Sequence, residues 1–247
     1  MEAVNADTQI DQHKIMYFGG FTFGWPKCLD DTEPWCYGCV FTPRYADRIA
    51  RKAREGEHLV LDNGAWPAAR DLKKLQKDDP SLTIDDVQTL EEQLQDMHEA
   101  VETVGEDRIR WIVVPDVVGD AEASWERSMK AMPELFQYGR EKLLLPIQNG
   151  QDPWEVAFMA HPGGVFIGGK TTKKTKQWKF DQVRAFNALP WNVYTHIGRI
   201  SSEDHIAKAK RLGVDSFDTT TFLRSYGWNA KQDFVPRLKK HCKKFTG

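Results

Sequence analysis

The chain has 247 residues, with 34 Lys and Arg against 36 Asp and Glu, so its formal net charge is −2. This near-neutral charge excludes a histone-like polycation, but it does not exclude nucleic-acid binding through a local basic patch. Hydrophobic residues make up 40% and charged residues 28% of the chain. This balance excludes an intrinsically disordered chain and predicts one water-soluble globular domain over residues 1–247.

The sequence carries no signal for export or membrane insertion. No apolar run approaches the roughly 20 residues that a membrane-spanning helix needs. The first residues are polar and acidic, unlike a secretory signal. Four cysteines in a chain without an export signal indicate reduced thiols. We therefore expect a cytoplasmic protein with no membrane partner.

Short apolar runs rich in β-formers recur along the chain, and turn residues bound each of them. Such runs are typical of strands that are buried on both faces of a parallel sheet. They are Lys14–Gly20, Leu59–Ala65, Arg110–Val118, Lys142–Gly150, Val165–Lys170, Asn192–Ile200 and Ser216–Thr220.

Helical patterns lie between these runs. Thr83 is expected to open a long helix over residues 83–105, because acidic residues in the first turn suit the helix dipole. Asp120 is expected to cap a helix over residues 120–139. The other predicted helices are Pro43–Gly56, Asp152–His161, Phe180–Leu189, Ser202–Leu212 and Ala230–Lys244.

The alternation of strands and helices predicts an α/β fold with a parallel sheet. No strand leads into a GxGxxG turn, which argues against a doubly wound dinucleotide-binding sheet, whereas about 250 residues is typical of a TIM barrel. Only seven strands are evident, so Trp66–Ile109 or Phe21–Val40 hides or replaces another. We expect a (β/α)8 TIM-type barrel that is irregular or has a degenerate strand.

Polar residues and glycines stand where the predicted strands end. In a TIM barrel these ends line the active site, so we expect the side chains there to meet in one pocket. Each also has a local explanation, such as a helix cap, an Asx turn, a bulge or, for His196, a hydrogen-bonded core histidine. The residues are Asp62, Asp116, Gln148, Gly168, Gly169, His196 with Gly198 and Arg199, and Asp218.

Three carboxylates in one pocket suggest either a divalent metal site or glycosidic chemistry. A metal site usually includes a histidine close to the carboxylates, and only His196 lies at a strand end. In glycosidic exchange, one carboxylate attacks the sugar carbon and another handles the proton of the leaving group. Glycine amides such as those of Gly168 and Gly169 suit a carbonyl oxygen.

The motifs LDNGAW, VVPDVVGD, PIQNG, FIGGK, HIGRI and GVDSFDTTTFLR occur in an order similar to that of the tRNA-guanine transglycosylases. The chain resembles still more their DNA-acting relatives, the 7-deazaguanine DNA transglycosylases of phages and bacterial modification islands. The resemblance spans about Phe18 to Arg224. It implies that guanine in DNA is exchanged for a free 7-deazaguanine base of the preQ0 or queuosine-like type, in the host cytoplasm if the gene belongs to a phage.

The resemblance also implies a role for each matching residue. Asp218 corresponds to the nucleophile that attacks C1′, and Asp62 to the general acid and base. Asp116 and Gln148 correspond to readers of the guanine edge. The remaining expected substrate contacts are the amides of Gly168 and Gly169 at O6, His196, and Arg224 at a phosphate.

The chain also departs from the tRNA-acting members. They carry a zinc site of clustered cysteines and a histidine after the nucleophile, where this chain has only Cys242, and this favours DNA over tRNA. The acidic residue and cysteine that follow the base-reading Asp are replaced by Val117 and Val118. A zinc site at Cys28, Cys36 and Cys39 with His13 or Cys242 is only weakly indicated, so no cofactor is expected.

Basic segments are candidates for binding the DNA backbone. Lys170–Lys179 follows the diglycine, and its Lys170, Lys173, Lys174 and Lys176 are the expected phosphate contacts. A second run, Arg237–Lys244, lies on the last predicted helix. Phe21, Trp25 and Trp66 are candidates either for stacking on an unstacked base or for ordinary packing.

Two other functions and two kinds of assembly remain open. A tRNA-guanine transglycosylase of reduced form and a non-catalytic nucleic-acid-binding barrel both agree with the motifs. A partner protein and a homodimer also both agree with the sequence.

Overall fold

The computed structural model describes residues 16–20, 38–53, 58–161, 163–169, 173–200 and 202–219. In these residues, parallel strands form a closed barrel in chain order, and the last strand pairs with the first. The predicted α/β class and parallel barrel are confirmed, and the arrangement is consistent with a TIM-type barrel. The strands are β1 (Met16–Gly20), β2 (Gly38–Phe41), β3 (His58–Leu61), β4 (Ile109–Val113), β5 (Leu143–Ile147), β6 (Gly164–Ile167), β7 (Tyr194–Ile197) and β8 (Ser216–Thr219).

Strand β2 is the strand that the sequence patterns did not resolve. It lies at the end of Phe21–Val40, one of the two stretches expected to hide a strand, and it joins β1 to β3. Its first residue must be glycine, because a Cβ atom on Gly38 would lie 1.5 Å from the carbonyl oxygen of His58. Only a residue without a side chain therefore allows β2 and β3 to pair in this register.

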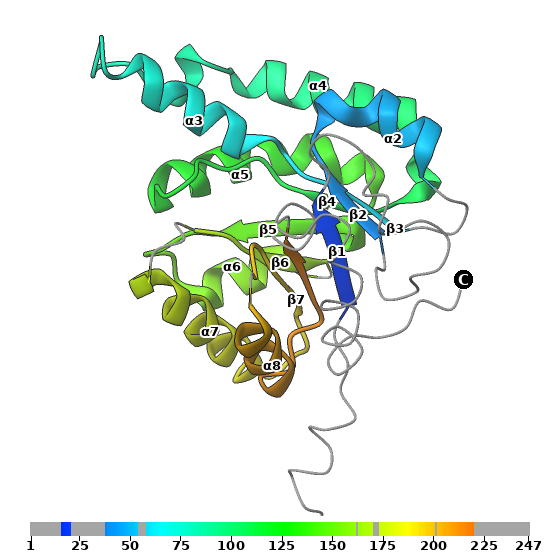
Figure 1. Cartoon of the computed structure of the whole chain (residues 1–247), viewed down its shortest axis with the longest axis vertical. Coiled ribbons are helices and arrows are strands. Elements are labelled where there is room, and N and C mark those ends of the chain that lie inside the picture. The colour runs from blue at the N-terminus through cyan, green and yellow to red at the C-terminus, as the bar shows by residue number, and fades with distance from the viewer. Residues whose placement is uncertain are drawn as a thin grey trace, which may run out of the picture.

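Helices lie around the outside of the strands (Figure 1). Neighbouring helices pack on one another, as α2 does on α4 and α6 does on α7. The helices are α2 (Ala46–Lys52), α3 (Ala65–Leu75), α4 (Leu90–Val104), α5 (Ala121–Leu135), α6 (Pro153–Ala160), α7 (Lys173–Asn187) and α8 (Glu203–Arg211), with 3-10 turns η2 (Pro43–Tyr45), η3 (Ile84–Asp86), η4 (Glu106–Arg108), η5 (Phe136–Tyr138) and η6 (Arg140–Lys142).

Three helix predictions need correction. The long helix expected from Thr83 is wrong at its start, because Thr83 caps only the turn η3 and a second capping box at Thr89 begins α4. Helix α3 was not expected, and its third residue is Pro67. Proline is tolerated in a first turn, whose N–H groups need no partner within the helix.

Helix α7 begins at Lys173 rather than at Phe180, so much of the basic segment Lys170–Lys179 is helical. The predicted cap of α5 is confirmed, because the Asp120 carboxylate accepts a hydrogen bond of 3.0 Å from the amide of Ala123. The predicted helix Ala230–Lys244 lies outside the described residues.

The strands are buried on both faces, as their continuous apolar runs predict. On β3, Leu59 and Leu61 pack outward in the layer between strands and helices, whereas Val60 packs inside the barrel with Phe18 and Leu144. This alternation decides which residues at the strand ends face the barrel interior. Among the described helices, none combines the length and apolar content that crossing a membrane requires.

Candidate functional site

At the carboxyl ends of the strands, polar residues occupy positions whose side chains face the barrel interior. Val60 faces inward on β3, and Asp62 follows it by two residues; Leu144 faces inward on β5, and Gln148 follows it by four. On β8, Asp218 pairs in register with the inward-facing Phe18. Since side chains alternate with a period of two, these three polar side chains point to one end of the barrel interior.

Asp62 lies in a partly buried position where its charged form is disfavoured. Burial raises its pKa to about 7, and the charges of Asp218 and Asp116 add to this rise. The amide of Gly64, which donates to Oδ1 at 3.2 Å, and the charge of Arg199 oppose the rise. Because the charges of both Asp218 and Asp116 act on Asp62, the three carboxyl groups lie near one another, as expected from the strand ends.

Asp116 is held by two side-chain amides. Asn63 Nδ2 donates to its Oδ1 at 2.9 Å, and Gln148 Nε2 donates to its Oδ2 at 2.5 Å. The orientation of Gln148 is set because its Oε1 accepts a hydrogen bond from the amide of Gly119 at 3.1 Å. Burial raises the pKa of Asp116, and the two amide donors oppose this rise. The sequence prediction that Asp116 and Gln148 act together is therefore matched by direct contact.

Buried polar side chains on the surrounding helices support the amide clamp, that is, Asp116 with Asn63 and Gln148. Gln93 on α4 donates to the carbonyl oxygen of Asn63 at 2.7 Å, and Arg127 on α5 donates to Gln93 Oε1 at 2.9 Å. Sequence reasoning missed Asn63, Gln93 and Arg127. Asn63 had a signal, because it directly follows Asp62 in LDNGAW, whereas a helical Gln and Arg resemble any solvent-facing pair.

His196 lies in the barrel core beneath Asp218. It does not reach the mouth, which is the end of the barrel where the strands end at their carboxyl side. Its ring is fully buried and stacks on Phe166, with ring centroids 4.9 Å apart. Tyr194 donates to Ser216 Oγ at 2.6 Å, which leaves the serine proton for His196 Nδ1 at 2.8 Å. The Nε2 proton of a neutral ring then points to Asp218 Oδ2 at 3.2 Å. Both ring nitrogens are engaged in the core, which matches the alternative of a hydrogen-bonded core histidine, and His196 orients Asp218. The substrate contact expected of His196 stays a prediction.

The amides of Gly168 and Gly169 were both expected to face a base, but they lie in different environments. The amide of Gly168 donates to the carbonyl oxygen of Ile147 at 3.3 Å and so continues the ladder between β5 and β6. Gly169 has a φ of +81°, and a Cβ there would lie 2.8 Å from Asn149 Oδ1. Within the described residues, the Gly169 amide has no acceptor, so it is the amide that remains for a ligand.

Arg199 stands in the loop after β7, at one of the strand ends that the sequence singled out, although no role was predicted for it. Its guanidinium carbon lies 3.7 Å from the ring centroid of Trp66, at the start of α3. Burial lowers the pKa of Arg199, while the nearby Asp218 and Asp62 raise it. A planar cation and an indole therefore lie together beside the two carboxyl groups, and Trp66 remains one of the predicted stacking candidates.

Several predicted site residues lie outside the described residues, and others have no described side chain. Lys173, Lys174 and Lys176 belong to the first turns of α7, but only their backbone is described. The Cys39 thiol is buried in β2 and donates to the carbonyl oxygen of Val40, and the described part of the chain holds no cluster of three or more potential metal ligands. The residues outside are His13, Phe21, Trp25, Cys28, Cys36, Lys170, Arg224, Cys242 and the run Arg237–Lys244.

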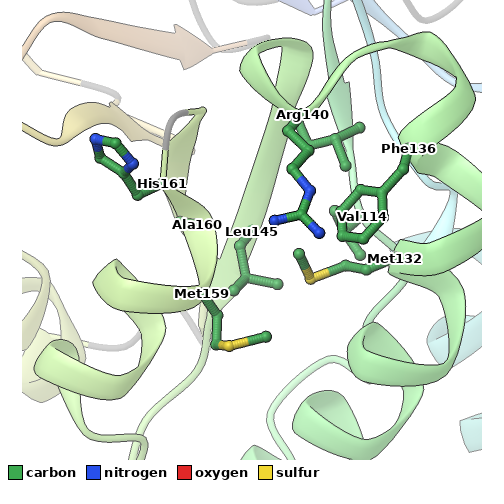
Figure 2. A pocket seen from close by; sticks show the side chains of 9 residues that line it. Val114, Met132, Phe136, Arg140, Leu145, Met159, Ala160 and His161 are labelled. Carbon is green, nitrogen blue, oxygen red and sulfur yellow. The ribbon is translucent and has the colours of Figure 1, made fainter.

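A small pocket lies elsewhere, in the layer between the barrel and helices α5 and α6 (Figure 2). Leu143 and Leu145 contribute its β5 side, and they belong to the outward-facing layer of the core. None of the predicted site residues lines it. The other lining residues are Val114, Met132, Phe136, Arg140, Met159, Ala160 and His161.

The raised pKa of Asp62 predicts a specific effect on stability. Between pH 3.8 and about 7 the folded state binds more protons at Asp62 than the unfolded state does, so stability falls as pH rises through this window. We expect Asp62→Asn to stabilise the fold at pH 8 by roughly 1–3 kcal/mol and to have little effect near pH 4. Urea unfolding at the two pH values measures this difference.

Asp71→Asn is the matched control. Asp71 is exposed, and its hydrogen bonds with Lys74 and Arg70 hold its pKa below the usual value, so its replacement gives no gain at pH 8. An Asp62→Asn effect that is the same at both pH values contradicts the assignment of a raised pKa.

Neither a scan against protein-family models nor a search of curated proteins finds a match to this chain. The functional interpretation therefore depends on the sequence motifs and on the geometry of the mouth. That geometry brings together three carboxyl groups, a side-chain amide clamp, a backing histidine and a stacked arginine.

Proposed function

We propose that this protein is a DNA-guanine transglycosylase that exchanges guanine in DNA for a free 7-deazaguanine base of the preQ0 type. The observation that carries the proposal is the convergence of Asp62, Asp116 and Asp218 at one end of the barrel interior. The second support is the order of the sequence motifs, which resembles that of the transglycosylases. In this proposal the barrel is a (β/α)8 barrel whose active site lies at the carboxyl ends of the strands.

The reaction proceeds in two displacements with retention at the sugar. A carboxylate oxygen of Asp218 attacks C1′, the bond from C1′ to N9 of guanine breaks, and the Asp62 carboxyl group gives its proton to the leaving base. Asp62 then takes the N9 proton of the incoming 7-deazaguanine. The nitrogen attacks C1′, and the ester bond to Asp218 breaks, which restores the carboxylate. No cofactor takes part in this sequence.

The clamp around Asp116 suits a base that carries both donors and acceptors on one edge. Asp116 offers carboxylate oxygens to the N–H groups of a guanine-type base, and Gln148 beside it offers both a donor and an acceptor. The amide of Gly169, which has no acceptor among the described residues, suits the base carbonyl oxygen. Because each group is already oriented by a neighbour, little reorganisation is needed when the base binds.

DNA is the proposed substrate rather than tRNA, because residues 219–247 hold only Cys242 where the tRNA-acting members carry clustered cysteines. The target nucleotide has to leave the helix stack to reach a barrel mouth, at a cost of roughly a few kcal/mol. Trp66, which is 48% exposed at the mouth, offers a surface for stacking.

Labelled-base exchange tests the proposal. We expect the purified protein to exchange labelled guanine with duplex DNA and to leave tRNA unlabelled. Nucleoside mass spectrometry of DNA from cells that express the protein with a 7-deazaguanine precursor pathway then identifies the inserted base. Exchange into tRNA alone points to the reduced tRNA enzyme. DNA binding without exchange, and without a covalent adduct, points to a non-catalytic barrel, and either result overturns the proposal.

A further inference from the structure

The stacked side chains of Trp66 and Arg199, called here the Trp66–Arg199 pair, join two loops at the mouth. Trp66 follows β3 and Arg199 follows β7. The guanidinium lies over the indole face at 3.7 Å, and it is close enough to Asp62 and Asp218 for both charges to act on it. The pair therefore lies beside the two carboxyl groups to which the proposed function gives the chemistry.

Among the residues that the structure describes, none accepts a hydrogen bond from Arg199. A guanidinium has five N–H donors arranged in a plane, and stacking on Trp66 engages its face but leaves its edge free. Across the described residues, Arg199 makes no hydrogen bond and no ion pair within 4.0 Å, although Asp62 and Asp218 are nearby. A partly buried guanidinium with an unoccupied edge is suited to an anion that comes from outside.

The backbone holds Arg199 in place at a conformational cost. Its φ is +64°, and it is the only non-glycine residue with a positive φ among those described. The carbonyl oxygen of Gly198 before it accepts from Lys179 Nζ at 2.9 Å, and the amide of Ile200 after it donates to the carbonyl oxygen of Asp218 at 3.0 Å. Because both flanking peptides are fixed, the strained conformation is imposed on Arg199, and strain of this kind concentrates at functional sites.

We infer that Arg199 is the residue that binds the phosphate next to the reacting sugar, with Trp66 holding the guanidinium plane in position. The inference depends on the proposed function, because it names the part of the nucleic acid that the mouth recognises. An arginine edge contacts two phosphate oxygens at once, and the flanking phosphate lies close to a sugar whose C1′ faces Asp218. Arg199 also offsets the repulsion between that phosphate and the carboxyl groups beside it.

The salt dependence of DNA binding distinguishes two roles for Arg199. One is binding a phosphate, and the other is acting only on the carboxyl groups of Asp62 and Asp218. Each phosphate contact contributes about 0.9 to the slope of log affinity against log salt concentration. We expect Arg199→Asn to weaken binding of a duplex oligonucleotide by about tenfold and to reduce the slope by about 1. Asparagine is chosen because it tolerates a positive φ, so the backbone conformation is kept.

Arg140→Asn is the matched control. Arg140 is an exposed arginine that lies 3.9 Å from the ring of Phe136 (Figure 2), but it borders the pocket between α5 and α6 rather than the mouth. We expect its replacement to leave both the affinity and the slope unchanged. Fluorescence anisotropy over a series of salt concentrations measures both quantities in the full-length protein.

The outcomes distinguish the two proposals. A parental protein that binds and exchanges DNA, with an unchanged slope in Arg199→Asn, overturns the phosphate contact alone. The phosphate contact is also overturned if Arg199→Asn changes the pH profile of exchange but keeps the parental salt slope, because Arg199 then acts only on the carboxyl groups. A reduced slope without any base exchange in the parent supports the phosphate contact and overturns the proposed reaction.

Discussion

We expect Asp218→Asn to slow base exchange by at least about 10⁴-fold while the fold is retained. An amide oxygen does not form the ester with C1′, so the first displacement has no nucleophile. The shape of the side chain is kept, and an asparagine oxygen still accepts the hydrogen bond that His196 Nε2 offers at 3.2 Å. Labelled guanine exchange into DNA measures the rate, and thermal unfolding shows that the variant is folded.

A second measurement follows the covalent intermediate. With DNA but no free base, the parental protein accumulates a protein–DNA adduct that survives denaturing electrophoresis, and Asp218→Asn forms none. Asp120→Asn is the matched control, because asparagine caps a helix as well as aspartate does and Asp120 lies on the surface at the start of α5. An Asp218→Asn variant that exchanges base within tenfold of the parental rate would rule out Asp218 as the nucleophile.

The acids of this site were predictable because strand periodicity is local. Asp62 and Asp218 continue the inward register of apolar runs that are readable in the sequence, and a parallel barrel places all such ends on one face. Asp116 was predictable for another reason: Pro115 and Val117 favour extended backbone around it, and Asp120 already supplies the helix cap. These positions depend on the strand pattern and on the closure of the barrel.

The supporting residues were not predictable, because their roles depend on contacts distant in sequence. Gln93 reaches the Asn63 carbonyl oxygen from α4, and Arg127 reaches Gln93 from α5. His196 illustrates a related limit. Its position at a strand end is the same for a histidine that contacts substrate and for one that orients a carboxylate, and only the partners of both ring nitrogens distinguish them.

The bounds of one strand and one backbone conformation were also not predicted, because their local signals are mixed. Strand β2 is four residues long and begins with Gly38, whose importance appears only in the close approach of His58. Arg199 adopts a conformation that its residue type disfavours, and hydrogen bonds on both sides of it impose that conformation. The sequence alone does not carry such information, because tertiary contacts oppose the local preference at these positions.

The raised pKa of Asp62 makes the two half-reactions depend on pH in opposite directions. Guanine release needs the protonated carboxyl group, whereas addition of the incoming base needs the carboxylate. Since burial raises the pKa to about 7, we expect release to fall about tenfold per pH unit above pH 7 and addition to fall similarly below it. Exchange over the complete cycle then has a bell-shaped profile with its maximum near neutral pH.

Asp62→Asn removes this dependence along with the activity. We expect release of guanine to fall by about 10²–10⁴-fold, and the residual rate to vary little between pH 5 and pH 9, since no group of this pKa remains to titrate at that position. Rapid-quench measurement of adduct formation follows the first half-reaction, and labelled-base incorporation into the preformed adduct follows the second. Asp71→Asn, on the surface of α3, keeps the parental profile. If the parental protein releases guanine at the same rate at pH 6 and pH 8, a carboxyl group with a pKa near 7 is not the proton donor, and the acid–base role of Asp62 is wrong.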